Sequence, residues 1–117
     1  MTVTTLSLNL VEGSVSFRFT PDAAEQLKAE LVDLVNRLKA IATTSGIGSQ
    51  RPAPQTPMEY QYTGDVFLEI FCNPNIWPSP FAAKVLVTVR DERIRLSTEA
   101  ELTRVIEDVN QYLETVG

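Results

Sequence analysis

Hydrophobic and polar residues alternate in two short segments near the start of the chain. In residues 4–11 a leucine recurs at every second position, and in residues 15–19 valine and phenylalanine follow the same spacing. This period of two is typical of a strand with one buried face. Glu12, Gly13 and Ser14 separate the segments, and a glycine can adopt the positive φ that a tight turn needs. The pattern therefore predicts an N-terminal β-hairpin.

The spacing of apolar residues lengthens after Thr20. Thr20, Pro21 and Asp22 form a typical helix start, because threonine accepts from free amides, proline fits the first turn and aspartate opposes the positive end of the helix dipole. Apolar residues then share one helix face, at Leu27, Leu31, Leu34, Val35, Leu38 and Ile41. This stripe predicts one amphipathic helix of about 20 residues.

The composition changes abruptly after this helix. Residues 43–57 contain two glycines, three prolines and a single large apolar side chain, which predicts an extended, flexible connection. The favoured interpretation is a spacer inside a single domain that spans residues 1–117. The alternative is a docking arm with residues 51–54 in polyproline conformation.

The strand pattern returns after this connection. Three segments alternate or are continuously apolar and so predict strands, at residues 58–62, 66–72 and 83–90. The first two are separated by an interruption at Gly64, where a bulge or turn is expected. Asp91 and Glu92 predict a tight turn into a further short strand at residues 93–96.

The chain ends on a second amphipathic segment. Thr98 and Glu101 have the spacing of a capping box, which predicts a helix start at this point. The apolar stripe that follows consists of Leu102, Val105, Ile106, Val109 and Leu113. The complete order, ββα, linker, βββα, predicts a two-layer α+β fold in which two helices cover one face of a mainly antiparallel sheet of about five strands.

The composition narrows the range of functions. The 117 residues are 44% hydrophobic and carry a net charge of −5, which indicates one soluble domain and argues against binding to nucleic acid or to an anionic membrane. One cysteine and no histidine exclude an internal disulfide, most zinc sites and most catalytic triads. Residues 1–5 lack the features of a signal peptide, so a cytoplasmic protein is expected.

No residue pattern predicts catalysis, a cofactor or a metal site. Cys72 is the strongest nucleophile in the sequence. The alternation of residues 66–72 directs its side chain toward the core, and the chain has no histidine to activate the thiol. A structural role is therefore expected for Cys72. Neither a phosphate-binding glycine motif nor a nucleophile elbow occurs in the sequence.

The acidic residues of the last segment are expected on its exposed side, at Glu101, Glu107, Asp108 and Glu114. Arg104 lies within helical reach of Glu101 and Asp108, so local ion pairs explain these charges. The alternative interpretation is an acidic docking surface for a basic partner.

The outward face of the predicted sheet is the most informative feature of the sequence. Alternation directs Phe67, Phe71 and Leu86 away from the helices, among charged residues, although such a face normally carries polar side chains. A second subunit, another protein or the chain's own loop at residues 73–81 is expected to cover it. Trp77 is the anchor in either case.

These observations predict a non-enzymatic protein-interaction, adaptor or assembly module that binds a protein partner or a second copy of itself. The candidate interaction residues are Phe67, Phe71, Leu86, Trp77, Phe81, Arg93 and Arg95. The alternative is a small-molecule binding or sensing domain, with a pocket between the Trp77 loop and the sheet lined by Tyr60, Trp77, Arg93 and Arg95. A weaker third hypothesis is an enzyme that uses arginine and carboxylate groups with a substrate-borne or metal activator.

Overall fold

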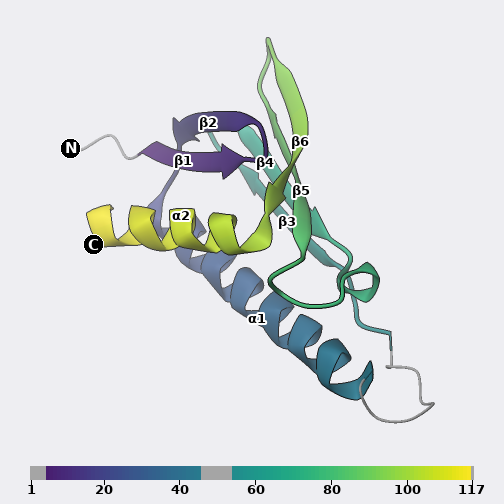
Figure 1. The fold of residues 1–117 in the computed structure, drawn as a ribbon. Helices are drawn as coiled ribbons and strands as arrows, with labels where there is room; N and C mark the ends of the chain where they lie inside the picture. The colour runs from purple at the N-terminus through teal and green to yellow at the C-terminus, as the bar shows by residue number, and fades with distance from the viewer. Residues whose placement is uncertain (1–4, 46–53, 117) are drawn as a thin grey trace.

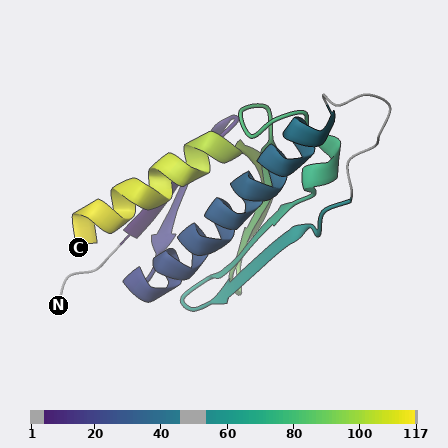
Figure 2. The same cartoon turned by 90° about the horizontal axis from the view of Figure 1, so that it is seen from below.

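The computed structural model describes residues 5–45 and 54–116. Its elements follow the chain as β1 (Thr5–Leu10), β2 (Gly13–Arg18), α1 (Pro21–Ser45), β3 (Met58–Thr63), β4 (Phe67–Cys72), η1 (Pro74–Ile76), β5 (Lys84–Arg90), β6 (Arg95–Glu101) and α2 (Leu102–Val116) (Figure 1). The predicted α+β class is confirmed, and both helices lie on one side of the larger sheet (Figure 2).

The described strands form two antiparallel sheets and not the single sheet of about five strands that the sequence predicted. One sheet has two strands, β1 and β2, and the other has four strands in the order β3-β4-β5-β6. The hairpin meets β6 through one backbone hydrogen bond, from Val11 N to Glu99 O at 3.2 Å. Because the hairpin packs mainly against α2, its strands do not continue the ladder of the larger sheet (Figure 1).

The predicted N-terminal hairpin is confirmed, together with the role of its glycine. Leu8 of β1 lies opposite Val15 of β2, and Leu10 lies opposite Gly13 at the turn. Gly13 has a φ of 108°, a conformation that strains residues with a Cβ. The turn therefore depends on a glycine at this position.

Helix α1 begins as the sequence predicted. The hydroxyl of Thr20 accepts a hydrogen bond from the N–H of Ala23 at 3.2 Å, and Pro21 is the first helical residue. The helix continues through Ser45 and so extends three residues into the predicted connection at 43–57. Residues 46–53 of that connection, with most of the proposed docking arm, lie outside the described residues.

The last strand and helix have different boundaries from those predicted. β6 extends to Glu101, with Thr98 paired to Val87 and Glu101 paired to Lys84, so these residues do not form a capping box. The N–H of Leu102 then donates to the carbonyl of Ala83 at 3.0 Å. The backbone pairing with β5 therefore delays the start of α2 to Leu102.

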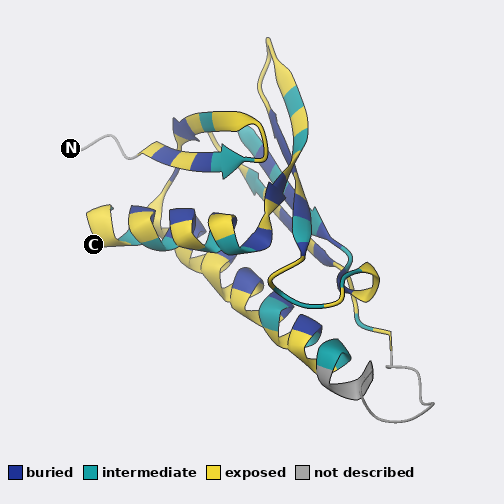
Figure 3. Ribbon diagram, viewed as in Figure 1, coloured by how far each residue is buried: buried dark blue, intermediate teal, exposed yellow. Residues whose placement is uncertain are grey.

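One core joins both sheets and both helices. The apolar stripe of α1 is buried at Leu27, Leu31, Leu34 and Leu38. Phe19, which follows β2, contacts Tyr62 of β3 and Tyr112 of α2 edge to face, with ring centroids 4.7 and 6.0 Å apart. Exposed residues follow the outer sides of the helices (Figure 3). Within the described residues, neither helix has the length and apolar character needed to cross a membrane.

Candidate functional site

The alternation predicted for β4 and β5 places alternate side chains on opposite faces of the larger sheet. Leu68 and Ile70 are fully buried toward the core, while Phe67, Glu69 and Phe71 point to the other side and are only part-buried. We call this second side the outer face. It carries three aromatic or aliphatic side chains, since Leu86 of β5 also lies there.

Leu86 and Phe71 form the apolar centre of the outer face. They are direct cross-strand partners, and Leu86 is 44% exposed to solvent. Leaving an apolar side chain in water is unfavourable, and burying one against a partner contributes about 1.5–3 kcal/mol. This pair therefore leaves an apolar patch partly exposed to solvent on the outer face.

Polar side chains surround this pair and are ordered by contacts within the chain. The guanidinium of Arg90 lies 4.3 Å from the ring centroid of Phe67, which is a cation–π geometry. Thr88 faces outward yet is only 5% exposed, and its hydroxyl lies 2.7 Å from that of Ser97. These polar side chains of the outer face are thus held in place by contacts within the chain.

The turn between β5 and β6 differs from the prediction. The carboxylate of Asp91 accepts from the N–H groups of Arg93 and Ile94 at 2.8 and 2.9 Å, and these bonds lower the pKa of this exposed side chain. Arg93 and Ile94 therefore belong to the turn and not to a strand. Ile94 is 63% exposed at this turn.

The Trp77 loop does not serve as the internal cover for the outer face. The short helix η1 contacts α1, and the part-buried Trp77 packs against the main core. Asn75 ties this region to the chain before β3, because its side chain exchanges two hydrogen bonds of 2.8 Å with the backbone of Gln55. Phe81, in contrast, is 85% exposed.

The pocket proposed between the Trp77 loop and the sheet is not formed by the residues predicted to line it. Tyr60 is buried, and its hydroxyl donates to the carbonyl of Ala23 at 3.2 Å. Arg93 and Arg95 lie at the turn between β5 and β6, whereas Trp77 follows the opposite end of β4 (Figure 1). The structure separates these residues by the length of the sheet.

A different concave surface lies between α1 and α2. It has a volume of about 310 Å³, and its apolar lining includes Leu31, Val32, Val35, Ile106 and Val109. Lys28 and Lys39 border it along α1. We call it the interhelical groove. No sequence pattern predicted this groove, because residues of two helices far apart in the chain form it together.

Cys72 points into the core, as the alternation of residues 66–72 predicted. The residue is 2% exposed, and burial raises the pKa of the thiol from 9.0 to about 11. The thiol is therefore protonated at neutral pH, and a protonated thiol is a poor nucleophile. This environment supports a packing role.

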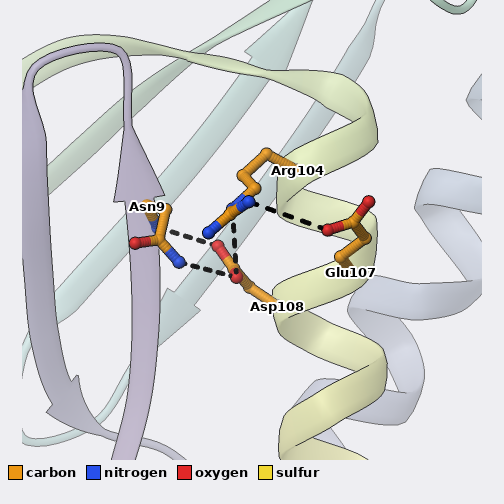
Figure 4. Close-up of polar contacts among 4 residues, drawn as sticks. All are labelled: Asn9, Arg104, Glu107 and Asp108. Atoms are coloured by element: carbon orange, nitrogen blue, oxygen red, sulfur yellow. Dashed lines mark hydrogen bonds and ion pairs between the residues drawn. The ribbon is translucent and has the colours of Figure 1, made fainter.

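Asp108 corrects the prediction that it belongs to a solvated helix face. It is 7% exposed and accepts hydrogen bonds from the backbone N–H and the side-chain amide of Asn9, at 2.7 and 2.9 Å (Figure 4). Arg104 lies between two acids, 3.9 Å from Glu107 and 4.0 Å from Asp108. The predicted ion pair of Arg104 with Asp108 is thus present, but its second acidic partner is Glu107 and not the predicted Glu101. Asp108 connects α2 to β1 and does not contribute to an acidic surface.

The remaining acids do not form a continuous surface on α2. Glu107 and Glu114 are exposed on the helix, whereas Glu101 ends β6. In the part of the chain that the structure describes, no three acidic or cysteine side chains gather closely enough to hold a metal ion.

Comparisons with protein-family models, with curated proteins and with solved structures gave no match to this chain.

Proposed function

We propose that this chain is a non-enzymatic interaction module that binds a protein partner through the outer face of its four-stranded sheet. The observation that supports the proposal is the exposed apolar centre formed by Leu86 and Phe71 on a sheet whose other face is already packed. An exposed apolar patch with polar surroundings is a typical interaction site.

Trp77 has a supporting role in this proposal. It is part-buried against the core, so it stabilises the loop that follows β4 and is not a contact of the outer face. Phe81 and Ile76, which are 85% and 66% exposed, remain candidates for a separate contact at this end of the molecule. The proposal places the module in the cytoplasm, where the lone thiol of Cys72 stays reduced.

The experiment compares two lysine substitutions at similarly exposed apolar positions. Leu86→Lys changes the outer face, and Val32→Lys changes α1 at a residue of 51% exposure. Each purified variant and the wild type would serve as bait, with circular dichroism and thermal midpoint as folding controls. Loss of partner capture by Leu86→Lys alone is expected, because a charge placed in a desolvated contact is costly. Equal capture by both variants would contradict the proposal.

Small-molecule binding is the second candidate function, at the interhelical groove and not beside Trp77. Its volume of about 310 Å³ and apolar lining suit a small amphiphile whose anionic end lies near Lys28 or Lys39. Ile106→Trp would fill the groove and should abolish binding of a fatty-acid probe. Unchanged probe affinity would exclude this site.

A further inference from the structure

Charges on the outer face are separated along the strand direction. The strand register brings Phe67, Arg90 and Arg95 into one transverse row, which we call the basic row. A second row, the acidic row, contains Glu59, Phe71, Leu86 and Glu99. Between them lies the middle row of Gln61, Glu69, Thr88 and Ser97. Beyond the acidic row, Lys84 is paired with Glu101 on the same face. The outer face is therefore positive on one side of its middle row, and on the other side its acidic side chains outnumber the single lysine.

Arg95 and Glu99 cannot neutralise each other within one chain. Arg95 and Glu99 are both exposed and lie on the same face of β6, four positions apart. Four residues of a strand span about 13 Å, which exceeds the reach of an ion pair. Arg90 already stacks on Phe67. Arg95 and Glu99 are thus the charges best placed to meet a second molecule.

We propose that the outer face pairs with a second copy of this chain around a two-fold axis that runs along the middle row. The inference rests on the proposed function and identifies the protein partner as this second copy. Such an axis reverses the strand direction and places each strand opposite its own copy. Arg95 then faces Glu99 of the second copy, and Phe67 faces Phe71 of the second copy. Because the contact is two-fold, each of these pairings occurs twice.

The charge pattern selects this axis over the other simple arrangement. A two-fold axis parallel to the strands would place the basic row on the basic row and bring Arg90 close to its own copy. Juxtaposed like charges disfavour an interface. The axis along the middle row brings opposite charges together and joins the apolar side chains of both rows.

Glu69 gives the proposed arrangement a specific signature. It lies in the middle row, where Gln61 donates a hydrogen bond to its carboxylate at 2.9 Å. An axis along this row brings the two Glu69 carboxylates of a dimer near each other. Glu69→Gln removes that repulsion with little change of shape, and it should lower the dimer dissociation constant by about threefold to tenfold.

The test measures self-association of the purified chain by sedimentation over a range of concentrations. Arg95→Glu and Glu99→Arg should each raise the dissociation constant by about tenfold or more, because each places like charges opposite each other. An equimolar mixture of the two variants should associate as tightly as the wild type, since both contacts of the mixed dimer then join opposite charges. The double variant should also recover association. Glu30→Arg on α1 and Glu114→Arg on α2 reverse exposed charges away from the outer face and should have no effect.

The outcomes separate this inference from the proposed function. A chain that stays monomeric at all concentrations, or a mixture of variants that fails to associate, overturns self-pairing. If Leu86→Lys still abolishes capture of another protein in that case, the proposed function stands with a different partner. Circular dichroism identifies any charge-reversal variant that fails to fold. In that case Glu69→Gln provides the test. If this variant folds and its dimer dissociation constant equals that of the wild type, the proposed axis is wrong.

Discussion

The carboxylate of Asp108 on α2 accepts two hydrogen bonds from Asn9 of β1, a residue 99 positions earlier in the chain. The backbone N–H of Asn9 donates at 2.7 Å and its side-chain amide donates at 2.9 Å. This contact gives hydrogen-bond partners both to the backbone N–H of β1 that points toward α2 and to the nearly buried carboxylate of Asp108. It fixes the N-terminal hairpin to the last helix of the fold.

Asp108→Asn should destabilise the protein by about 1.5–3 kcal/mol, because it removes the charge that strengthens both hydrogen bonds and presents a donor to a donor. Urea unfolding measures the loss. Glu107→Gln is the matched control, since the Glu107 side chain is 70% exposed and its ion pair with Arg104 contributes little. Equal stability of the two variants would contradict the bridging role of Asp108.

Tyr112→Phe should cost about 1 kcal/mol. The Tyr112 hydroxyl donates to the buried carbonyl of Phe19 at 2.7 Å, and its removal leaves that acceptor without this donor. Tyr62→Phe is the control, because Tyr62 belongs to the same aromatic cluster and its hydroxyl makes no hydrogen bond among the described residues. The thermal midpoint should fall for the first variant and stay close to wild type for the second. A larger effect of Tyr62→Phe would contradict this assignment.

Gly64→Ala should destabilise the turn between β3 and β4 by about 1–3 kcal/mol. A Cβ at this position would lie 2.5 Å from the ring carbon Cζ of Tyr62, so the ring would have to leave its packing against Phe19. The glycine is therefore required for space. In a double-mutant cycle, Tyr62→Ala should abolish the additional cost of Gly64→Ala. Additive effects of the two substitutions would indicate a backbone cause.

The burial of Cys72 predicts a loss of stability at alkaline pH. Burial raises the thiol pKa from 9.0 to about 11, so the folded state holds its proton after the unfolded state has released it. The contribution is fully present below pH 9 and is lost as the pH rises through 11, by about 2 kcal/mol at pH 11. The free energy of unfolding of wild type and Cys72→Ala should converge over this range. A constant difference between them would contradict burial of the thiol.

Residues whose roles depend on near neighbours were predictable from the sequence. The alternation of β1, β4 and β5, the start of α1 at Thr20 and Pro21, and the turn at Gly13 all follow from backbone geometry and local hydrogen bonding. The same alternation directed Phe71 and Leu86 to the outer face, and the buried position of Cys72 followed in the same way. These features depend on period and turn chemistry, which a short segment contains in full.

Relationships between distant segments required the tertiary structure. The pairing of β6 with β5 overrode the local capping signal at Thr98, because backbone hydrogen bonds along a ladder outweigh one side-chain cap. Asp108 looked like an exposed helix charge until Asn9 was placed against it. The alignment of Arg95 with Arg90 and of Glu99 with Leu86 likewise depends on the strand register. Local patterns in the chain thus predicted most elements and their buried faces, whereas the packing of these elements brings together the residues that meet across them.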